Sequence, residues 1–271
     1  MRINTNINAM IATNQMTKNT ALAGSSMEKL STGLRINKAG DDAAGLAVSE
    51  KMRAQIRGME QAERNVQDGI SMVQTAEGAL EEAGNIAQRM RELGIQAGND
   101  TLSSDDRSKI KSELDQLQKE MGDIAKEAKF NGKELLTKAA ADTTFTIQAG
   151  ANTEVREIRM TDLSAIAGSI TATDVSTVKA AQSFVEKIDK ALEAINSGRS
   201  TLGAMQNRLE YTSNNLTTTT ENLSAAESRI RDVDVAKEMV KLSKLNILNQ
   251  ASQAMVSQAK QQPESVTQLL R

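Results

Sequence analysis

The sequence lacks histidine, cysteine and tryptophan, and the first two absences each exclude a class of chemistry. Without histidine there is no imidazole-based general acid–base catalysis, no Ser-His-Asp triad and no HExxH metal site. Without cysteine there is no disulfide framework, thiolate nucleophile or zinc–sulfur site. A cysteine-free chain is compatible with the cytosol and equally with an exported protein that does not depend on disulfides.

Aromatic residues and proline are also scarce, because the 271 residues include three Phe, one Tyr and one Pro. The large side chains that fill a broad globular core are therefore nearly absent. Ala, Gln, Glu, Lys, Leu and Met, which lose little side-chain freedom in a helix, are abundant. This composition predicts a mainly α fold: an elongated antiparallel multi-helix bundle or coiled coil.

The charge balance does not favour nucleic acid or a membrane as a partner. The net charge is −2, and acidic and basic residues alternate along the chain, which is typical of solvated helix faces. No run approaches the roughly 18–20 apolar residues needed to cross a bilayer. The opening MRINTNINAMIATNQM lacks the apolar core and cleavage site of a secretory signal, so export would use a route that this signal does not mark.

Two long stretches carry apolar residues every seven positions, which predicts two long helices over about 42–97 and 176–230. A third helix, over about 104–129, is predicted from apolar residues at 4-3-4-3 spacing after a capping pair of Ser103 and Asp106. The first row is Met52, Met59, Val66, Val73, Leu80 and Ala87; the second is Ile188, Ile195, Leu202, Leu209, Leu216, Leu223 and Ile230. The second row continues through LTTTTENL, so helix is expected there although Thr is a weak helix former.

The stretch from about 142 to 162 alternates between apolar and polar residues and predicts a small β-hairpin. The region after it, to about Val175, is rich in Ser, Thr, Ala and Gly and is expected to be irregular. Asn131-Gly132 is a turn signal at the end of the third helix.

The two ends of the chain are weakly charged and modestly amphipathic. We predict that they form helices that pair with each other and need further copies of the chain for stability, rather than frayed tails. The candidate self-assembly residues are Ile3, Ile7, Met10, Ile247, Met255, Val266, Leu269 and Leu270.

A glycine-rich joint precedes the first long helix in NKAGDDAAGLAVSEKM. Asp41 and Asp42 look like an acid–base pair, but a helix cap explains them with fewer assumptions. RIRDVDVAKEM forms a second joint late in the chain, and the near-symmetric plan suggests Arg229 and Arg231 as the cationic neighbours of the two aspartates.

No motif in the sequence indicates catalysis or a cofactor. The carboxylate pairs Asp41/Asp42, Asp105/Asp106 and Asp232/Asp234 fit neither a calcium loop nor an aromatic-lined glycosidase cleft, and no phosphate-binding loop occurs. We therefore expect no enzyme activity, no metal and no cofactor.

The sequence resembles bacterial flagellin over essentially its whole length. The resemblance rests on MRINTNINAM, MEKLSTGLRINKAGDDAAGLAVSEKMRAQIRG, NVQDGISMVQTAEGALEE, QRMRELGIQAGN, FNGKELL, RLEYTSNNL, ENLSAAESRIRDVDVAKEM and the terminal QLLR, in the family's order. The chain looks like a short form that lacks the variable outer domains of longer members.

The resemblance implies a structural subunit that self-assembles into the flagellar filament, a secreted, extracellular organelle of swimming motility. It implies an inner-core helix at 1–33, a joint at 34–44, an outer-core rod domain at 45–230, a second joint at 231–237 and a C-terminal inner-core helix at 238–271. The implied partners are other flagellin subunits, a cytosolic export chaperone, the flagellar type III export apparatus, and the filament cap and hook-associated proteins.

The resemblance also implies recognition by a host Toll-like receptor. QRMRELGIQ matches the recognised segment, with Arg89 and Leu93 at its key positions and Glu113 as the supporting acid, although Gly94-Ile95 replaces the more usual Ala-Val. These residues could equally serve contacts between subunits. A hook–filament junction protein and, less favoured, a soluble coiled-coil signalling or interaction protein remain the alternatives.

Overall fold

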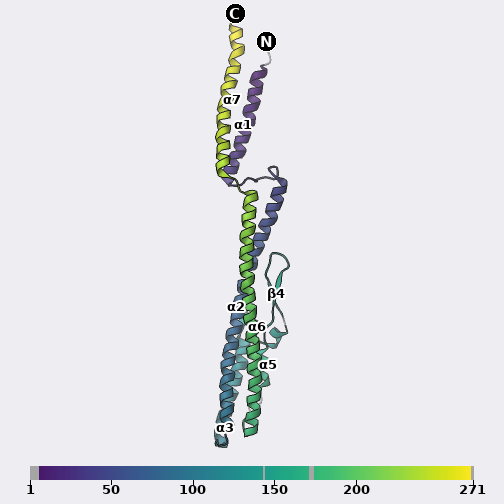
Figure 1. Cartoon of the computed structure of the whole chain (residues 1–271), viewed down its shortest axis with the longest axis vertical. Coiled ribbons are helices and arrows are strands. Elements are labelled where there is room, and N and C mark those ends of the chain that lie inside the picture. The colour runs from purple at the N-terminus through teal and green to yellow at the C-terminus, as the bar shows by residue number, and fades with distance from the viewer. Residues whose placement is uncertain (1–5, 143, 171–173, 270–271) are drawn as a thin grey trace. The chain divides into compact units, whose positions relative to one another are not determined.

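The computed structural model describes residues 6–142, 144–170 and 174–269, which form mainly α-helices together with two antiparallel hairpins (Figure 1). The predicted mainly α fold with a small hairpin is confirmed. The elements in chain order are α1 (Ile7–Thr32), α2 (Ala43–Ala97), α3 (Ser104–Glu127), β1 (Lys129–Phe130), β2 (Lys133–Glu134), α4 (Lys138–Ala141), β3 (Phe145–Gln148), β4 (Val155–Ile158), α5 (Leu163–Ser169), α6 (Val178–Arg231) and α7 (Val235–Leu269).

These elements form two compact units. The terminal unit comprises the described residues of 1–54 and 222–271, and the central unit comprises those of 55–221. The long helices α2 and α6 each contribute residues to both units.

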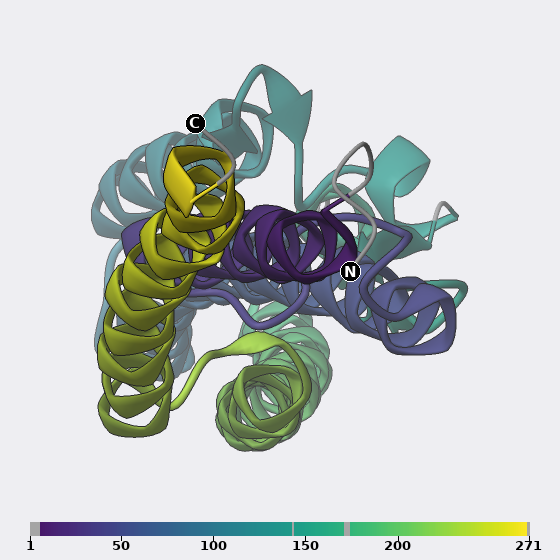
Figure 2. The same ribbon diagram turned by 90° about the horizontal axis from the view of Figure 1, so that it is seen from above.

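In the terminal unit, α1 and α7 run side by side in opposite directions, and Figure 2 shows them as neighbouring helices. The Asn6 side chain donates a hydrogen bond to the Ala259 carbonyl at 2.6 Å. At the other end of the pair, the Val233 N–H donates to the Gly33 carbonyl at 3.0 Å. The prediction that the N- and C-terminal helices pair is therefore confirmed.

The helix ends follow from local capping chemistry. The Asn6 side chain accepts from the Ala9 N–H at the start of α1, and Gly33, with φ of +72°, ends that helix in the left-handed region that favours glycine. At the start of α3, the Ser103 hydroxyl accepts from the Asp106 N–H at 3.3 Å and donates to the Asp106 carboxylate at 2.8 Å. The predicted capping pair is confirmed.

The central unit has a continuous apolar core that buries most of the two heptad rows, from Val66 to Ala87 on α2 and from Ile188 to Leu216 on α6. From α6, Ile188, Ile195 and Leu209 are fully buried, as are Val73 and Leu80 from α2. This burial explains why both helices are long, since most helical stability in proteins comes from packing an apolar face.

The threonine-rich segment of α6 is helical, as the register of its leucines predicts. Thr217, Thr218 and Thr219 each donate their hydroxyl to the carbonyl four residues earlier, at 3.0, 2.9 and 2.7 Å. The hydroxyls are thus satisfied within the helix and do not compete with its backbone hydrogen bonds.

Three short elements lie where the sequence predicts none: the helices α4 and α5 and the β1–β2 hairpin. The region after the β3–β4 hairpin, expected to be irregular, contains α5, which is capped by Asp162 and buries Leu163 and Ala167. Asn131-Gly132, expected only as a turn, connects the β1–β2 hairpin, with φ of +49° and +77° at the two residues. Pairing of Lys129 with Glu134 in this hairpin also ends α3 at Glu127 instead of the predicted 129.

The β3–β4 hairpin, predicted over 142–162, pairs Phe145 with Ile158 and Gln148 with Val155. It packs on α2 through glycine. A Cβ atom added at Gly58 would lie 2.9 Å from the Ala151 Cβ and 3.1 Å from its Cα, so the hairpin loop approaches the helix too closely for any side chain at that position.

We predict opposite effects for two Gly→Ala substitutions in α2. Gly78→Ala should raise the free energy of unfolding by up to about 1 kcal/mol, because Gly78 has no atom within 4 Å of an added Cβ and Ala is the better helix former. Gly58→Ala should be about 1–3 kcal/mol less stable than Gly78→Ala, because the hairpin loop must move. Urea unfolding of both variants measures the difference; equal stabilities would contradict the close packing.

Candidate assembly surface

The helix pair of the terminal unit buries polar rather than apolar residues on the α1 side. The buried residues of α1 are Asn19 and Ser26, which are 3% and 0% exposed. Asn19 accepts a hydrogen bond from the Gln15 side chain at 3.3 Å. The α7 side adds Leu242 and Leu245. We call this buried strip the polar seam.

The same two helices leave large apolar side chains exposed to solvent. Val240, Ile247 and Met255 of α7 are 72%, 62% and 63% exposed. Further exposed apolar residues on the two helices are Ile7, Met10, Ile11, Leu22, Met27, Val235, Met239 and Leu248. Apolar surface of this extent on a helix pair marks an interaction surface.

Four of the predicted self-assembly residues, Ile7, Met10, Ile247 and Met255, belong to this surface. Ile3 and Leu270 lie outside the described residues, as do the side chains of Val266 and Leu269.

A shallow groove of about 540 Å³ runs between α1 and α7. Ile11 and Ala12 line it from α1, and Leu248, Ala251 and Met255 line it from α7. The groove offers an apolar surface of the kind that another helix could cover.

The two chain connections of the terminal unit are held together by backbone hydrogen bonds. Leu34 and Asp232 form an isolated antiparallel bridge, and the Arg35 N–H donates to the Arg231 carbonyl at 2.7 Å. The Arg35 guanidinium donates to the Ile230 carbonyl at 2.5 and 3.2 Å. The connection from α1 to α2 is thereby fixed against the connection from α6 to α7 (Figure 1).

Asp41 and Asp42 organise the first of these connections. The Asp42 carboxylate accepts from the Gly45 N–H at 2.9 Å, which is the geometry of a helix N-cap for α2. The Asp41 carboxylate accepts the backbone N–H groups of Lys38 and Asn37 at 3.0 and 3.1 Å. Those hydrogen bonds, that from Lys38 first, hold the pKa of Asp41 below its ordinary value.

The expected pairing of these aspartates with Arg229 and Arg231 is wrong. The buried Arg231 lies 2.5 Å from the Glu50 carboxylate of α2, and Asp42 lies 3.9 Å from Arg35. Arg229 is exposed and forms no ion pair within the part of the chain that the structure describes. The antiparallel bridge between Leu34 and Asp232 fixes the position of the second connection and so places Arg231 beside Glu50 of α2.

The predicted receptor residues lie in the central unit. Arg89 on α2 lies 3.1 Å from Glu113 on α3 and 3.1 Å from Glu92, and these hydrogen bonds raise the pKa of the guanidinium, that with Glu92 first. Leu93 is 2% exposed and belongs to the apolar core. The surface thus presents Arg89 and Glu113 but not Leu93, and the recognition role that the family resemblance implies for Leu93 stays a prediction.

Within the described residues, no group of three or more acidic side chains is arranged to hold a metal ion. No described helix is both long and apolar enough to span a membrane.

Comparison with known proteins identifies the family. The family model of the bacterial flagellin N-terminal helical region matches residues 3–141, and that of the C-terminal helical region matches residues 185–270. The chain belongs to the bacterial flagellin family. It is 54% identical to a flagellin of Halalkalibacterium halodurans and 47% identical to a flagellin of Bacillus subtilis, over the full length of each chain. It is 45% identical to the flagellar filament 33 kDa core protein of Treponema phagedenis, again over both full lengths.

Two solved structures are similar to this flagellin-family chain. The crystal structure of Bacillus cereus flagellin has a TM-score of 0.52 and 32% identity, covering 60% of this chain and 94% of that one. A putative flagellar hook-associated protein from Vibrio parahaemolyticus has a TM-score of 0.60, covering 71% of this chain and all of that one. At 12% identity, the second similarity shows the fold alone.

We predict that Asp41→Asn destabilises the chain at neutral pH and that the difference from the native chain vanishes in acid. Because the folded pKa of Asp41 is lowered, its stabilisation is present above the ordinary value of 3.8 and is lost as pH falls through the lowered folded value. Urea unfolding at several pH values measures the difference. As a control, Asp68→Asn alters an exposed carboxylate of α2 and should show a smaller effect; equal effects would contradict a special role for Asp41.

Proposed function

We propose that this chain is the structural subunit of a bacterial flagellar filament and polymerises with copies of itself. The observation that carries the proposal is the antiparallel helix pair, which buries Asn19 and Ser26 of α1 while it leaves many large apolar side chains of both helices exposed. Covering that surface releases about 25 cal/mol per Å² of apolar area, and an isolated copy cannot gain this free energy. The relatives named as flagellins and filament core proteins support the same function.

We propose the following division of the chain in the filament. Residues 1–33 and 238–271 form the inner core, residues 45–230 form the outer-core rod domain, and the joints lie at 34–44 and 231–237. The exposed apolar residues of α1 and α7 support an inner-core position, where neighbouring copies surround them. The buried core of the central unit supports a rod domain that needs no neighbour for its stability.

We further propose that the filament is extracellular and that its subunits leave the cell through the flagellar type III export apparatus. A chain with uncovered apolar residues along α7 needs protection before assembly, which supports a cytosolic chaperone that binds the C-terminal segment. The filament cap and hook-associated proteins complete the proposed partners. No catalytic role and no cofactor are proposed.

We also propose that a Toll-like receptor recognises the central unit at Arg89 and Glu113. The ion pair between Arg89 and Glu113 supports this proposal, because it joins α2 to α3 and still leaves both side chains about half exposed, at 52% and 47%. A receptor carboxylate or amide can therefore reach the Arg89 guanidinium.

The assembly proposal predicts that Ile247→Gln combined with Met255→Gln prevents or strongly weakens polymerisation. The expected rise in critical concentration is more than about tenfold, because burial of two large apolar side chains contributes several kcal/mol. Seeded assembly followed by light scattering and electron microscopy measures it.

The matched control is Val48→Gln combined with Val155→Gln, which removes two exposed apolar side chains from α2 and β4. This variant should raise the critical concentration less. If both variants polymerise as the native chain does, the apolar surface of α7 is not the assembly surface.

The receptor proposal predicts that Arg89→Glu reduces Toll-like receptor signalling by monomer at least about tenfold, as expected for a charge reversal at an interface. The control is Arg91→Glu, which reverses a charge on the same helix whose ion-pair partner is Asp189 on α6. A reporter-cell assay compares the two. Equal signalling by both variants and the native chain would exclude Arg89 from the receptor contact.

A further inference from the structure

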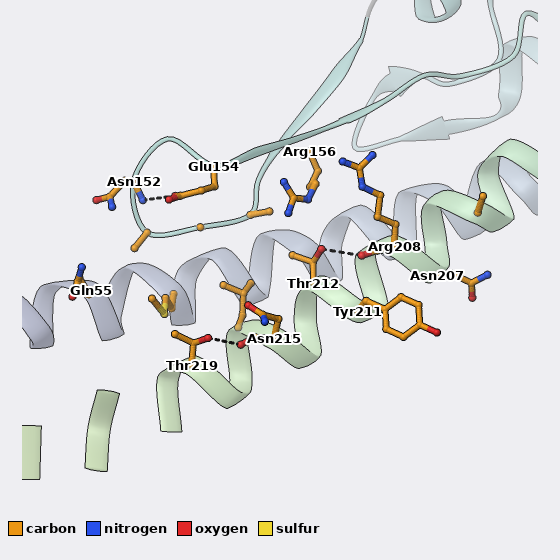
Figure 3. A pocket seen from close by; sticks show the side chains of 16 residues that line it. Gln55, Asn152, Glu154, Arg156, Asn207, Arg208, Tyr211, Thr212, Asn215 and Thr219 are labelled. Carbon is orange, nitrogen blue, oxygen red and sulfur yellow. Dashed lines mark hydrogen bonds between the residues drawn. The ribbon is translucent and has the colours of Figure 1, made fainter. Parts of the chain in front are cut away.

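A groove of about 690 Å³ in the central unit lies between the loop of the β3–β4 hairpin and helices α2 and α6 (Figure 3). Gln55 and Met59 line it from α2, and Asn207, Arg208 and Tyr211 line it from α6. Tyr211 is 76% exposed and is the one tyrosine of the sequence. The hairpin contributes residues 149–152, Glu154 and Arg156. We call this the hairpin groove.

Two arginines face each other across the hairpin groove without a carboxylate between them. Figure 3 shows Arg156 reaching from the hairpin toward α6 and Arg208 reaching from α6 toward the hairpin. The Arg156 Nε is buried and has no hydrogen-bond acceptor, while its Nη1 donates to the adjacent Val155 carbonyl at 3.3 Å. Glu154, the nearby acid, accepts instead from the Asn152 N–H at 3.1 Å.

Two arginines without a carboxylate partner in the groove favour the binding of an anionic group. A buried N–H without an acceptor is energetically unfavourable, and two guanidinium groups near each other repel. A carboxylate that enters the groove would satisfy both, because guanidinium and carboxylate match in shape and charge.

The same unit carries an acidic segment whose carboxylates are largely exposed, although Asp106 lies 3.7 Å from Lys109. The loop from α2 to α3 and the first turn of α3, residues 98–106, contain Asp100, Asp105 and Asp106. The Asp100 side chain is 96% exposed, and Asp105 is exposed and forms no ion pair within the described residues. The buried Arg107 holds the loop in place by donating to the Asn99 carbonyl at 3.1 Å, and its guanidinium lies 3.6 Å from the exposed Asp100 carboxylate. We call residues 98–106 the acidic loop.

The hairpin groove and the acidic loop lie at opposite ends of one helical stretch. Met59 lines the groove, and Ala97, which immediately precedes the loop, follows Met59 by 38 residues along α2. At 1.5 Å per residue the two surfaces are separated by about 57 Å. One chain therefore cannot bring its own loop to its own groove.

We propose that the acidic loop of one copy binds in the hairpin groove of the next copy, with Asp100 and Asp105 pairing with Arg156 and Arg208. Two different, complementary surfaces on one chain give a head-to-tail contact, which produces an open helical polymer when the rotation does not close. The inference rests on the proposed filament function and assigns one of its contacts to named residues.

The test uses charge reversal in the full-length chain. Arg156→Glu with Arg208→Glu reverses the groove, and Asp100→Lys with Asp105→Lys reverses the loop. Each double variant should raise the critical concentration for seeded assembly at least about tenfold, because like charges then meet at the contact. A chain with all four substitutions restores opposite charges and should return to within about threefold of the native value.

The control is Arg159→Glu with Lys187→Glu, which makes the same charge change at exposed sites outside the groove. Circular dichroism and thermal unfolding of the monomers establish that all variants fold. A groove variant that assembles like this control overturns the inference, and so does a fourfold variant without recovery. A loop variant that assembles normally while the groove variant fails also overturns it, because another partner then fills the groove. Failure of the native chain to form filaments would instead count against the proposed function.

Discussion

The polar seam between α1 and α7 is the constraint on which the terminal unit depends. A pair of helices has one shared face to bury, and α1 places Asn19 and Ser26 there, so its Ile and Met side chains face outward. The Asn19 amide accepts from Gln15 of its own helix, and buried amide and hydroxyl groups contribute little hydrophobic free energy to the pair. The exposed apolar side chains of both helices can gain free energy of burial only from a further partner, which links this pair to the proposed assembly.

The central unit is built on the opposite principle. Most residues of its heptad rows on α2 and α6 are buried, and α3, α5 and the β3–β4 hairpin complete the same core. Such a unit reaches its fold without neighbours and leaves its surface for electrostatic contacts, such as Arg89 with Glu113. The backbone bridge at Leu34 and Asp232 joins two connections that are almost 200 residues apart in sequence. One chain thus combines a self-sufficient unit with one that neighbouring copies must complete.

The sequence predicts well what local patterns determine. Leucines seven residues apart place α6 correctly even through four threonines, and Ser103 with Asp106 locates the start of α3. Contacts between distant segments are predicted poorly. The near-symmetric sequence plan suggests Arg229 and Arg231 as neighbours of Asp41 and Asp42, whereas the backbone bridge places Arg231 beside Glu50. Leu93 occupies a key position of the family's recognised segment, and the sequence does not show that the fold buries it in the apolar core. The helix α5 was missed because its seven residues are too few to show a period.

The hairpin groove shows why some functional residues cannot be found by pattern at all. Arg156 lies in a short alternating strand and Arg208 on a polar helix face, and in the sequence each resembles an ordinary solvated cation. What distinguishes them is the loop at Ala151, which Gly58 allows to approach α2, and which places the two guanidinium groups over one groove. Their unpaired state is a property of the fold, not of either residue. The hairpin groove leaves the buried Arg156 Nε without an acceptor, and α7 leaves large apolar side chains in solvent. Each unit therefore presents groups that contact with a second copy can satisfy.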